Sequence, residues 1–152
     1  MKFFTVVVLT LVIFTTSLVL IECQEDEVMK LQKEAMTQCT EEHPISQEAI
    51  KSIVNREHVP DDPEVKCWIR CAYEKLGVMK DGKLDWDRCN FLTKHCLDND
   101  EDKAKVDRIT EICRLEVSND EEDKCQLAYI GTVCKIDNWK KLGLPAMKLI
   151  ER

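Results

Sequence analysis

The sequence predicts an all-α fold of about six helices that are cross-linked by disulfide bonds. Beyond residue 24, the apolar side chains recur at the three- and four-residue spacing of helices and do not alternate as they would in strands. The chain contains only four glycines and four prolines, the residues that most often mark the turns of β folds. Its 152 residues suit one domain, and its nine cysteines indicate a disulfide framework if the protein is exported.

A secretory signal peptide is predicted for residues 1–23. Lys2 precedes an apolar run over residues 3–21, and an acidic, polar stretch follows. A membrane anchor is the alternative interpretation, but no basic stop-transfer flank follows the run. Cleavage after Cys23 would release residues 24–152 as one extracellular domain with eight cysteines. An even number of cysteines in a short exported chain favours disulfides over a zinc site.

The first two helices are predicted from apolar periodicity and one cap. A helix over residues 25–39 would place on one face the side chains of Val28, Leu31, Ala35 and Cys39. Ser46 is a good N-cap residue, and Ile50 and Ile53 follow it at helical spacing. A second helix is therefore expected to begin after Ser46.

A third helix has clear signals at both ends. Asp62 can cap its N-terminus, and Pro63 suits the first helical position because the amide there needs no partner. Gly77 predicts that the helix ends near Leu76, since glycine readily adopts the left-handed conformation after a helix. The segments VPDD before this helix and KDGK after it are predicted turns.

The next two helices follow in the second half of the chain. Asp85 is the predicted N-cap of a fourth helix that reaches about His95. A fifth helix is expected over residues 103–117, and its apolar side chains cover a wide arc because Ile112 and Leu115 lie well round from the others. We therefore expect the fifth helix to be buried on more than one side and to run through the middle of the domain.

A sixth helix and an apolar tail complete the prediction. Ser118 and Glu121 have the spacing of a capping box, and they predict a helix that reaches about Cys134. No segment beyond residue 24 has the pattern of a strand. The apolar side chains of the tail are expected to cover a pocket, with a loosely docked tail as the alternative. They are Leu142, Leu144, Met147, Leu149 and Ile150, and Trp139 is expected to lie beneath them.

Charge and motif content exclude several classes of function. The formal net charge is −7, whereas nucleic acids and anionic membranes are bound by basic surfaces. The three histidines are scattered, and no catalytic or phosphate-binding motif is present. The carboxylates from Asp98 to Asp102 lack the glycine and the closing glutamate of a calcium loop. We expect no enzyme activity, no cofactor and no metal.

Six of the cysteines have a distinctive spacing. Successive gaps of 27, three, 41, 11 and eight residues separate Cys39, Cys67, Cys71, Cys113, Cys125 and Cys134. This series resembles the six-cysteine pattern of insect odorant-binding and pheromone-binding proteins over essentially the whole chain after the signal peptide. The short gaps of three and eight residues are its most discriminating part.

The resemblance implies a fold and a function. In that family the cysteines pair first to third, second to fifth and fourth to sixth, a choice that the sequence alone cannot make. Applied to this sequence, the family's pairing implies the disulfides Cys39–Cys71, Cys67–Cys125 and Cys113–Cys134. The resemblance also implies helices around an apolar internal cavity that binds a small apolar ligand, with a chemosensory receptor as an indirect partner.

Two further cysteines, Cys89 and Cys96, depart from the six-cysteine pattern. Seven residues apart on a straight helix, their Cα atoms would be about 10.5 Å apart, which is too far for a disulfide. Either the fourth helix ends or bends before Cys96 and the two residues pair, or they do not pair with each other. We favour the first interpretation because free thiols are liabilities in an oxidising compartment. An intermolecular bridge is a third alternative.

Apolar residues on several predicted helices are candidates for the wall of the internal pocket. They are Ile53, Val54, Leu92, Val106, Ile109, Ile112, Leu127, Ile130, Val133 and Trp139. Periodicity cannot distinguish a pocket wall from ordinary core. Two rival functions share the secreted helical fold: a salivary, venom or reproductive-fluid protein that sequesters amines or lipids, and a signalling protein with a filled core. We expect a monomer or a weak homodimer, no nucleic-acid partner and no membrane insertion of the mature chain.

Overall fold

The computed structural model describes residues 27–146. The predicted signal peptide and the tail side chains of Met147, Leu149 and Ile150 lie outside the described residues. The chain divides after Lys33 into two compact units. The larger unit, which begins at Glu34, contains the disulfides, the core and the groove described below.

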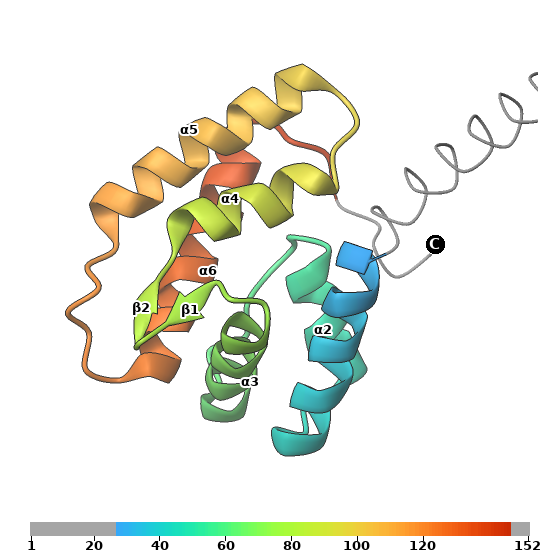
Figure 1. Ribbon diagram of the computed structural model, residues 1–152, viewed down its shortest axis with the longest axis vertical. Helices are drawn as coiled ribbons and strands as arrows, with labels where there is room; N and C mark the ends of the chain where they lie inside the picture. The colour runs from blue at the N-terminus through green and yellow to red at the C-terminus, as the bar shows by residue number, and fades with distance from the viewer. Residues whose placement is uncertain (1–26, 147–152) are drawn as a thin grey trace, which may run out of the picture. The chain divides into compact units, whose positions relative to one another are not determined.

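The described part of the chain confirms the all-α prediction. Residues 27–42 are helical, and the helices that follow are α2 (Gln47–Val54), α3 (Pro63–Lys75), α4 (Trp86–His95), α5 (Asp100–Glu116) and α6 (Lys124–Lys141) (Figure 1). Side chains cap the helices where the sequence indicates: Ser46 accepts a hydrogen bond from the Ala49 amide, and Asp62 accepts from two amides of α3. Gly77 has a φ of 70°, as expected for the residue after a helix.

The expectation that no strand follows residue 24 is wrong in one detail. Between α3 and α4, strands β1 (Met79–Lys80) and β2 (Lys83–Leu84) form a short antiparallel hairpin. The two turn residues, Asp81 and Gly82, both have positive φ angles, which is the geometry that favours Asp-Gly in two-residue hairpins. Four residues of strand are too few to show an alternating pattern in the sequence.

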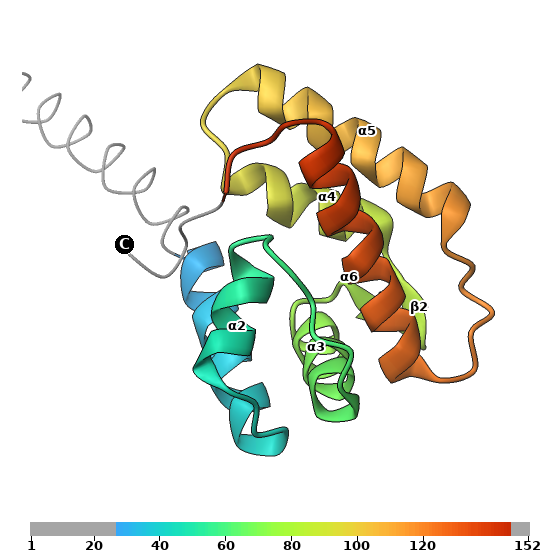
Figure 2. The same cartoon turned by 180° about the vertical axis from the view of Figure 1, so that it is seen from behind.

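Helix α6 occupies the central position that was predicted for α5. It lies between α3 and α5 and also contacts β2 (Figures 1 and 2). On α5, Leu115 is 85% exposed, so the wide apolar arc of that helix is not buried all round. Gly131 allows the hairpin to lie against α6, because a Cβ atom there would be 2.8 Å from Leu84 Cδ1.

The ends of α5 and α6 also differ from the prediction. Helix α5 begins at Asp100, because Asn99 caps it, and α6 begins at Lys124, because Asp123 accepts hydrogen bonds from two amides of its first turn. The Ser118 hydroxyl instead closes a turn with the Asp120 amide. Helix α6 continues past Cys134 because the turns that follow contain buried side chains.

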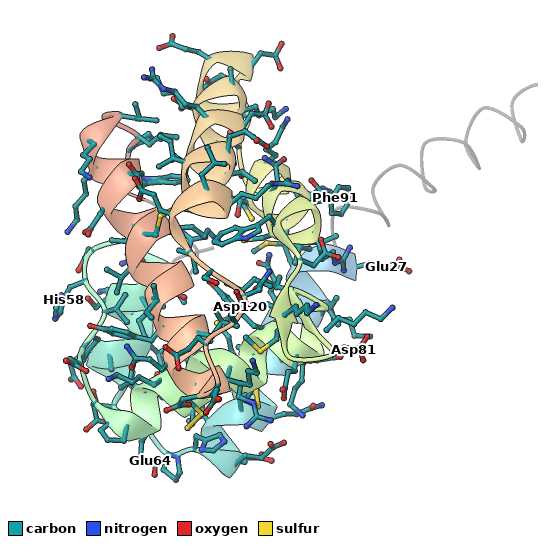
Figure 3. All side chains as sticks on the ribbon, turned by 90° about the vertical axis from the view of Figure 1, so that its left-hand side faces the viewer. Glu27, His58, Glu64, Asp81, Phe91 and Asp120 are labelled. Atoms are coloured by element: carbon teal, nitrogen blue, oxygen red, sulfur yellow. A yellow bond between two sulfur atoms is a disulfide. The ribbon has the colours of Figure 1, made fainter. Side chains whose placement is uncertain are left out.

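Three disulfides cross-link these helices with the pairing that the resemblance implies. Cys39–Cys71 joins the first helix to α3, Cys67–Cys125 joins α3 to α6, and Cys113–Cys134 joins α5 to α6 (Figure 3). The loops that they close overlap in sequence, so the bonds interlock. The constraint falls mainly on α3, α5 and α6.

The expected disulfide between Cys89 and Cys96 is not present. Helix α4 continues to His95, and Cys96 is its C-cap, whose amide donates to carbonyl groups of the last turn. The helix therefore neither ends nor bends early enough to bring the two sulfur atoms together. Cys89 is buried, and its sulfur atom faces Lys135 on α6.

Candidate functional site

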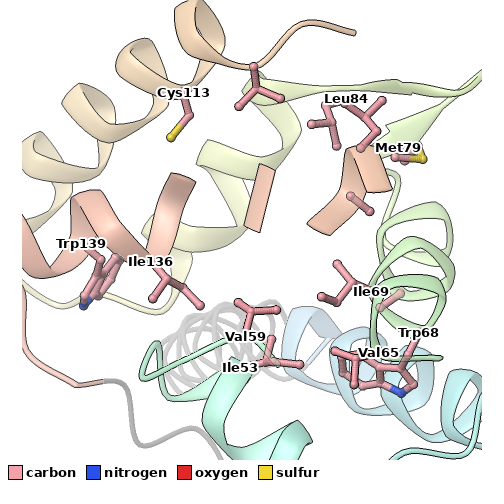
Figure 4. Packing of buried hydrophobic residues seen from close by; sticks show 14 of the residues in the cluster. Ile53, Val59, Val65, Trp68, Ile69, Met79, Leu84, Cys113, Ile136 and Trp139 are labelled. Atoms are coloured by element: carbon pink, nitrogen blue, oxygen red, sulfur yellow. The ribbon is translucent and has the colours of Figure 1, made fainter. Parts of the chain in front are cut away.

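The structure gathers most of the predicted pocket residues in or against one hydrophobic core (Figure 4). Five are buried members of the core: Ile53, Val106, Ile109, Leu127 and Trp139. Three are partly buried and pack against it: Val54, Ile130 and Val133. Leu92 is buried on α4 outside this cluster, and Ile112 is half-buried on α5. Their role as the wall of an internal cavity stays a prediction.

A groove of about 120 Å³ lies between α6 and the segment that connects α2 to α3. Its lining comprises His58, Val59, Tyr129, Val133, Ile136, Asp137 and Lys140. Val133 is the member of this set that was predicted from the sequence as a pocket residue. The volume is below the roughly 300–1,000 Å³ of sites for drug-sized ligands, so the groove suits a small molecule or one end of a longer molecule.

The groove has an apolar floor and a polar rim. Val59 and Ile136 are 4% and 2% exposed, and they form the floor. His58, Asp137 and Lys140 are exposed, and His58 projects outward from the surface (Figure 3). None of these five was predicted from the sequence. A loop and the polar face of a helix carry no apolar periodicity, and Ile136 lies beyond the predicted end of the sixth helix.

The connection beside the groove is held in an unusual backbone conformation. Arg56 has a φ of 63°, which non-glycine residues rarely adopt. Its guanidinium carbon lies 5.7 Å from the centroid of the Trp139 ring, a cation–π contact that ties the connection to α6. The Ser52 hydroxyl donates a hydrogen bond to the His58 carbonyl and fixes the other end.

Two polar atoms of this connection are buried without a hydrogen-bond partner among the described residues: Asn55 Oδ1 and Arg56 Nε. Leaving such an atom unpaired costs about 1–3 kcal/mol, so buried polar atoms normally have a partner. An acceptor and a donor on consecutive residues can both be satisfied by a water molecule or by a polar group of a ligand. No local pattern in the sequence indicates this pair.

The beginning of the tail docks on Trp139. The indole Nε1–H group donates a hydrogen bond of 2.9 Å to the Pro145 carbonyl, and Leu144 is buried. The Leu144 amide donates to the Trp139 carbonyl and holds the chain close to the end of α6. This observation supports a docked tail up to residue 146, while the cover over a pocket mouth stays a prediction.

Two groups with shifted pKa values, Asp107 and Arg114, lie outside the groove lining and join helices. Hydrogen bonds from Lys94 and then from Asn90 lower the pKa of the Asp107 carboxyl group, which links α5 to α4. A hydrogen bond to the Asp87 carboxylate, with a distance of 2.6 Å, raises the pKa of Arg114. These pairs are on the surface and stabilise the fold.

The described residues offer neither a metal site nor a membrane span. Within residues 27–146, His, Cys, Asp and Glu side chains do not form groups of three or more that could hold a metal ion. No helix of that part of the chain is both long enough and apolar enough to cross a bilayer.

Comparison with known families decides the assignment. The model of the PBP/GOBP family matches residues 22–138, a span that includes all three disulfides and the groove up to Asp137. The chain belongs to the PBP/GOBP family. This result confirms the resemblance to insect odorant-binding and pheromone-binding proteins.

Individual relatives agree with this assignment. General odorant-binding protein 56a of Drosophila melanogaster is 38% identical over 60 residues, which are 39% of this chain and 42% of the relative. Odorant binding protein 5 of Apis mellifera is 26% identical, with a TM-score of 0.58 over 76% of this chain and 89% of that one. Odorant-binding protein dmelOBP28a from Drosophila melanogaster is 23% identical, with a TM-score of 0.64 over 79% and 98%, and it shows the fold alone.

Membership of the family indicates a small-ligand carrier. The proteins that resemble this PBP/GOBP chain are odorant-binding proteins, a class of carriers rather than enzymes.

Proposed function

We propose that this protein is a secreted carrier that binds small hydrophobic molecules between its helices. The observation that carries the proposal is the groove with an apolar floor in a chain of the PBP/GOBP family. The signal-peptide pattern of residues 1–23 supports secretion.

The chemistry of the groove supports a ligand with an apolar body and one polar end. The side chains of Val59, Val133 and Ile136 offer dispersion contacts and exclude water from an apolar group. The exposed rim offers hydrogen-bonding groups of His58 and Lys140 to a polar end. A ligand that buries ten methylene groups would gain about 8 kcal/mol, and after ordering costs a Kd in roughly the micromolar range is expected. A groove of about 120 Å³ is too small for all ten groups, so it would take one end of such a ligand.

One observation favours a second candidate function, the sequestration of amines. The Asp137 carboxylate and the Tyr129 ring line the same groove, and both attract cations. However, the Lys140 ammonium group also lines it, and Lys66 lies over the Tyr129 ring at 4.7 Å. These two positive charges oppose a cationic ligand, so we propose a neutral ligand first.

Displacement of a fluorescent apolar probe from the purified protein tests the proposal. We expect micromolar displacement by neutral alcohols, esters or fatty derivatives, and weaker displacement by biogenic amines. A selective response to amines would replace the first proposal with the second. No probe binding with the disulfides intact would contradict both and would favour the signalling alternative.

A further inference from the structure

Helices α4 and α6 bring a thiol and an amine into unusually close contact. Lys135 Nζ lies 2.8 Å from Cys89 Sγ, although the two residues are 46 positions apart in the sequence. Five other hydrogen bonds that involve sulfur in the described part of the chain are 3.5 to 3.8 Å long. The contact between Lys135 and Cys89 is shorter than each of these five.

Both members of the pair are buried. Cys89 is 4% exposed and Lys135 is 9% exposed, which is rare for a lysine. Within residues 27–146 Lys135 forms no ion pair. Besides its contact with Cys89, Lys135 Nζ lies 5.9 Å from the centroid of the Tyr73 ring. A buried amine is normally paired with a carboxylate, because desolvation of a lone ammonium group is costly. Here the polar atom that faces it is a sulfur.

We propose that Cys89 and Lys135 form an oxidative cross-linking site, in which one oxygen atom bridges the sulfur and the nitrogen. A direct S–N bond would require the two atoms to move far closer than 2.8 Å. An intervening oxygen leaves them near their present separation. The geometry of the reduced pair thus matches the oxygen-bridged product better than it matches a sulfenamide.

The reaction balances with two equivalents of a peroxide. The first equivalent converts the thiol to a sulfenic acid and is reduced to water, so that the sulfur loses two electrons. The Lys135 side chain reacts as the neutral amine, and an ammonium form would first release a proton to solvent. The nitrogen atom then loses two electrons as the N–O bond forms. In that step one N–H bond and the sulfenic O–H bond break, and the second peroxide leaves as two water molecules.

The cross-link would constrain a helix that the three disulfides leave untethered. Those bonds connect the first helix, α3, α5 and α6, whereas α4 has no part in them. A covalent link from α4 to α6 removes conformational freedom from the unfolded chain as a disulfide does. Oxidation should therefore raise the melting temperature.

Mass spectrometry of the whole protein, with and without hydrogen peroxide, tests the site. We expect the oxidised protein to gain one oxygen atom and lose two hydrogen atoms, and proteolysis to yield a peptide pair joined through Cys89 and Lys135. Treatment with a thiol reductant should separate the pair. Cys89→Ser and Lys135→Arg should each abolish the cross-link, and Cys96→Ser is the matched control that should retain it.

Other products would overturn the proposal. A gain of two or three oxygen atoms on Cys89 alone means ordinary over-oxidation of an accessible thiol. Loss of two hydrogen atoms without gain of oxygen means a Cys89–Cys96 disulfide or a sulfenamide, which peptide mapping distinguishes. An unchanged mass also refutes it. The peptide pair from the wild-type protein is decisive even if Lys135→Arg fails to fold.

Discussion

Substitution of Val133 by phenylalanine tests whether ligands occupy the groove on α6. Val133 lines the groove and is half-buried, so a larger side chain can extend into the open volume without displacing the core. Phenylalanine adds about four carbon atoms, which would take the place of about four methylene groups of the ligand. At about 0.8 kcal/mol for each methylene, the loss is about 3 kcal/mol, or roughly two orders of magnitude in Kd.

The assay is titration of the wild-type and Val133→Phe proteins with the same fluorescent apolar probe. Leu115→Phe is the matched control, because Leu115 is 85% exposed on α5 and lies outside the groove lining. We expect the control to bind as the wild type does. An unchanged Kd for a correctly folded Val133→Phe protein would show that the ligand lies elsewhere, and the groove would no longer support the carrier function.

Local signals in the sequence are sufficient for most helix ends. The Asp62 cap followed by Pro63 and the glycine at position 77 act within a few residues, so their effect does not depend on the rest of the fold. The cysteine spacing likewise indicates the family without any knowledge of the fold, and the match to the family model confirms it.

Tertiary packing decides the features that were not predicted from the sequence. Helix α6 extends to Lys141 because Ile136 and Trp139 are buried against other segments, which no local pattern reveals. Leu115 belongs to an apolar arc, yet it faces solvent because no partner covers that side of α5 within the described chain.

The groove residues also show how far apolar periodicity can predict the candidate site. Its floor combines a loop residue, Val59, with residues of α6, and its rim is polar. Apolar periodicity therefore identifies Val133 and cannot identify His58 or Asp137. Periodicity cannot identify Lys135 either, because only the fold brings its amine to a thiol 46 residues away in the sequence.

Three further substitutions test the packing around the groove and the helix pairs. Gly131→Val should destabilise the protein by about 1–3 kcal/mol by overpacking against Leu84. Denaturant unfolding of the double variant with Leu84→Ala should show that the second substitution offsets part of this loss. If the two losses of stability simply added, the contact between these residues would be contradicted. A hydrogen bond from Lys94 lowers the pKa of Asp107 in the folded state. The ionised Asp107 carboxylate therefore stabilises the fold at pH values above its unfolded-state pKa of about 3.9, and this stabilisation is lost as the pH falls through its folded-state pKa. Asp107→Asn should therefore reduce stability slightly at pH 7 and weaken the fall of the melting temperature at acidic pH. An unaltered fall of the melting temperature at acidic pH would argue against the ion pair. Trp139→Phe retains the aromatic ring but removes the N–H group that binds the tail, which should cost about 0.5–1.5 kcal/mol. Within the described residues, Leu144 and backbone bonds then hold the tail without the indole, so limited proteolysis should cleave beyond residue 142 faster than in the wild type. Equal cleavage rates would mean that the indole bond does not hold the tail, and the proposal that the tail covers a pocket would lose its anchor.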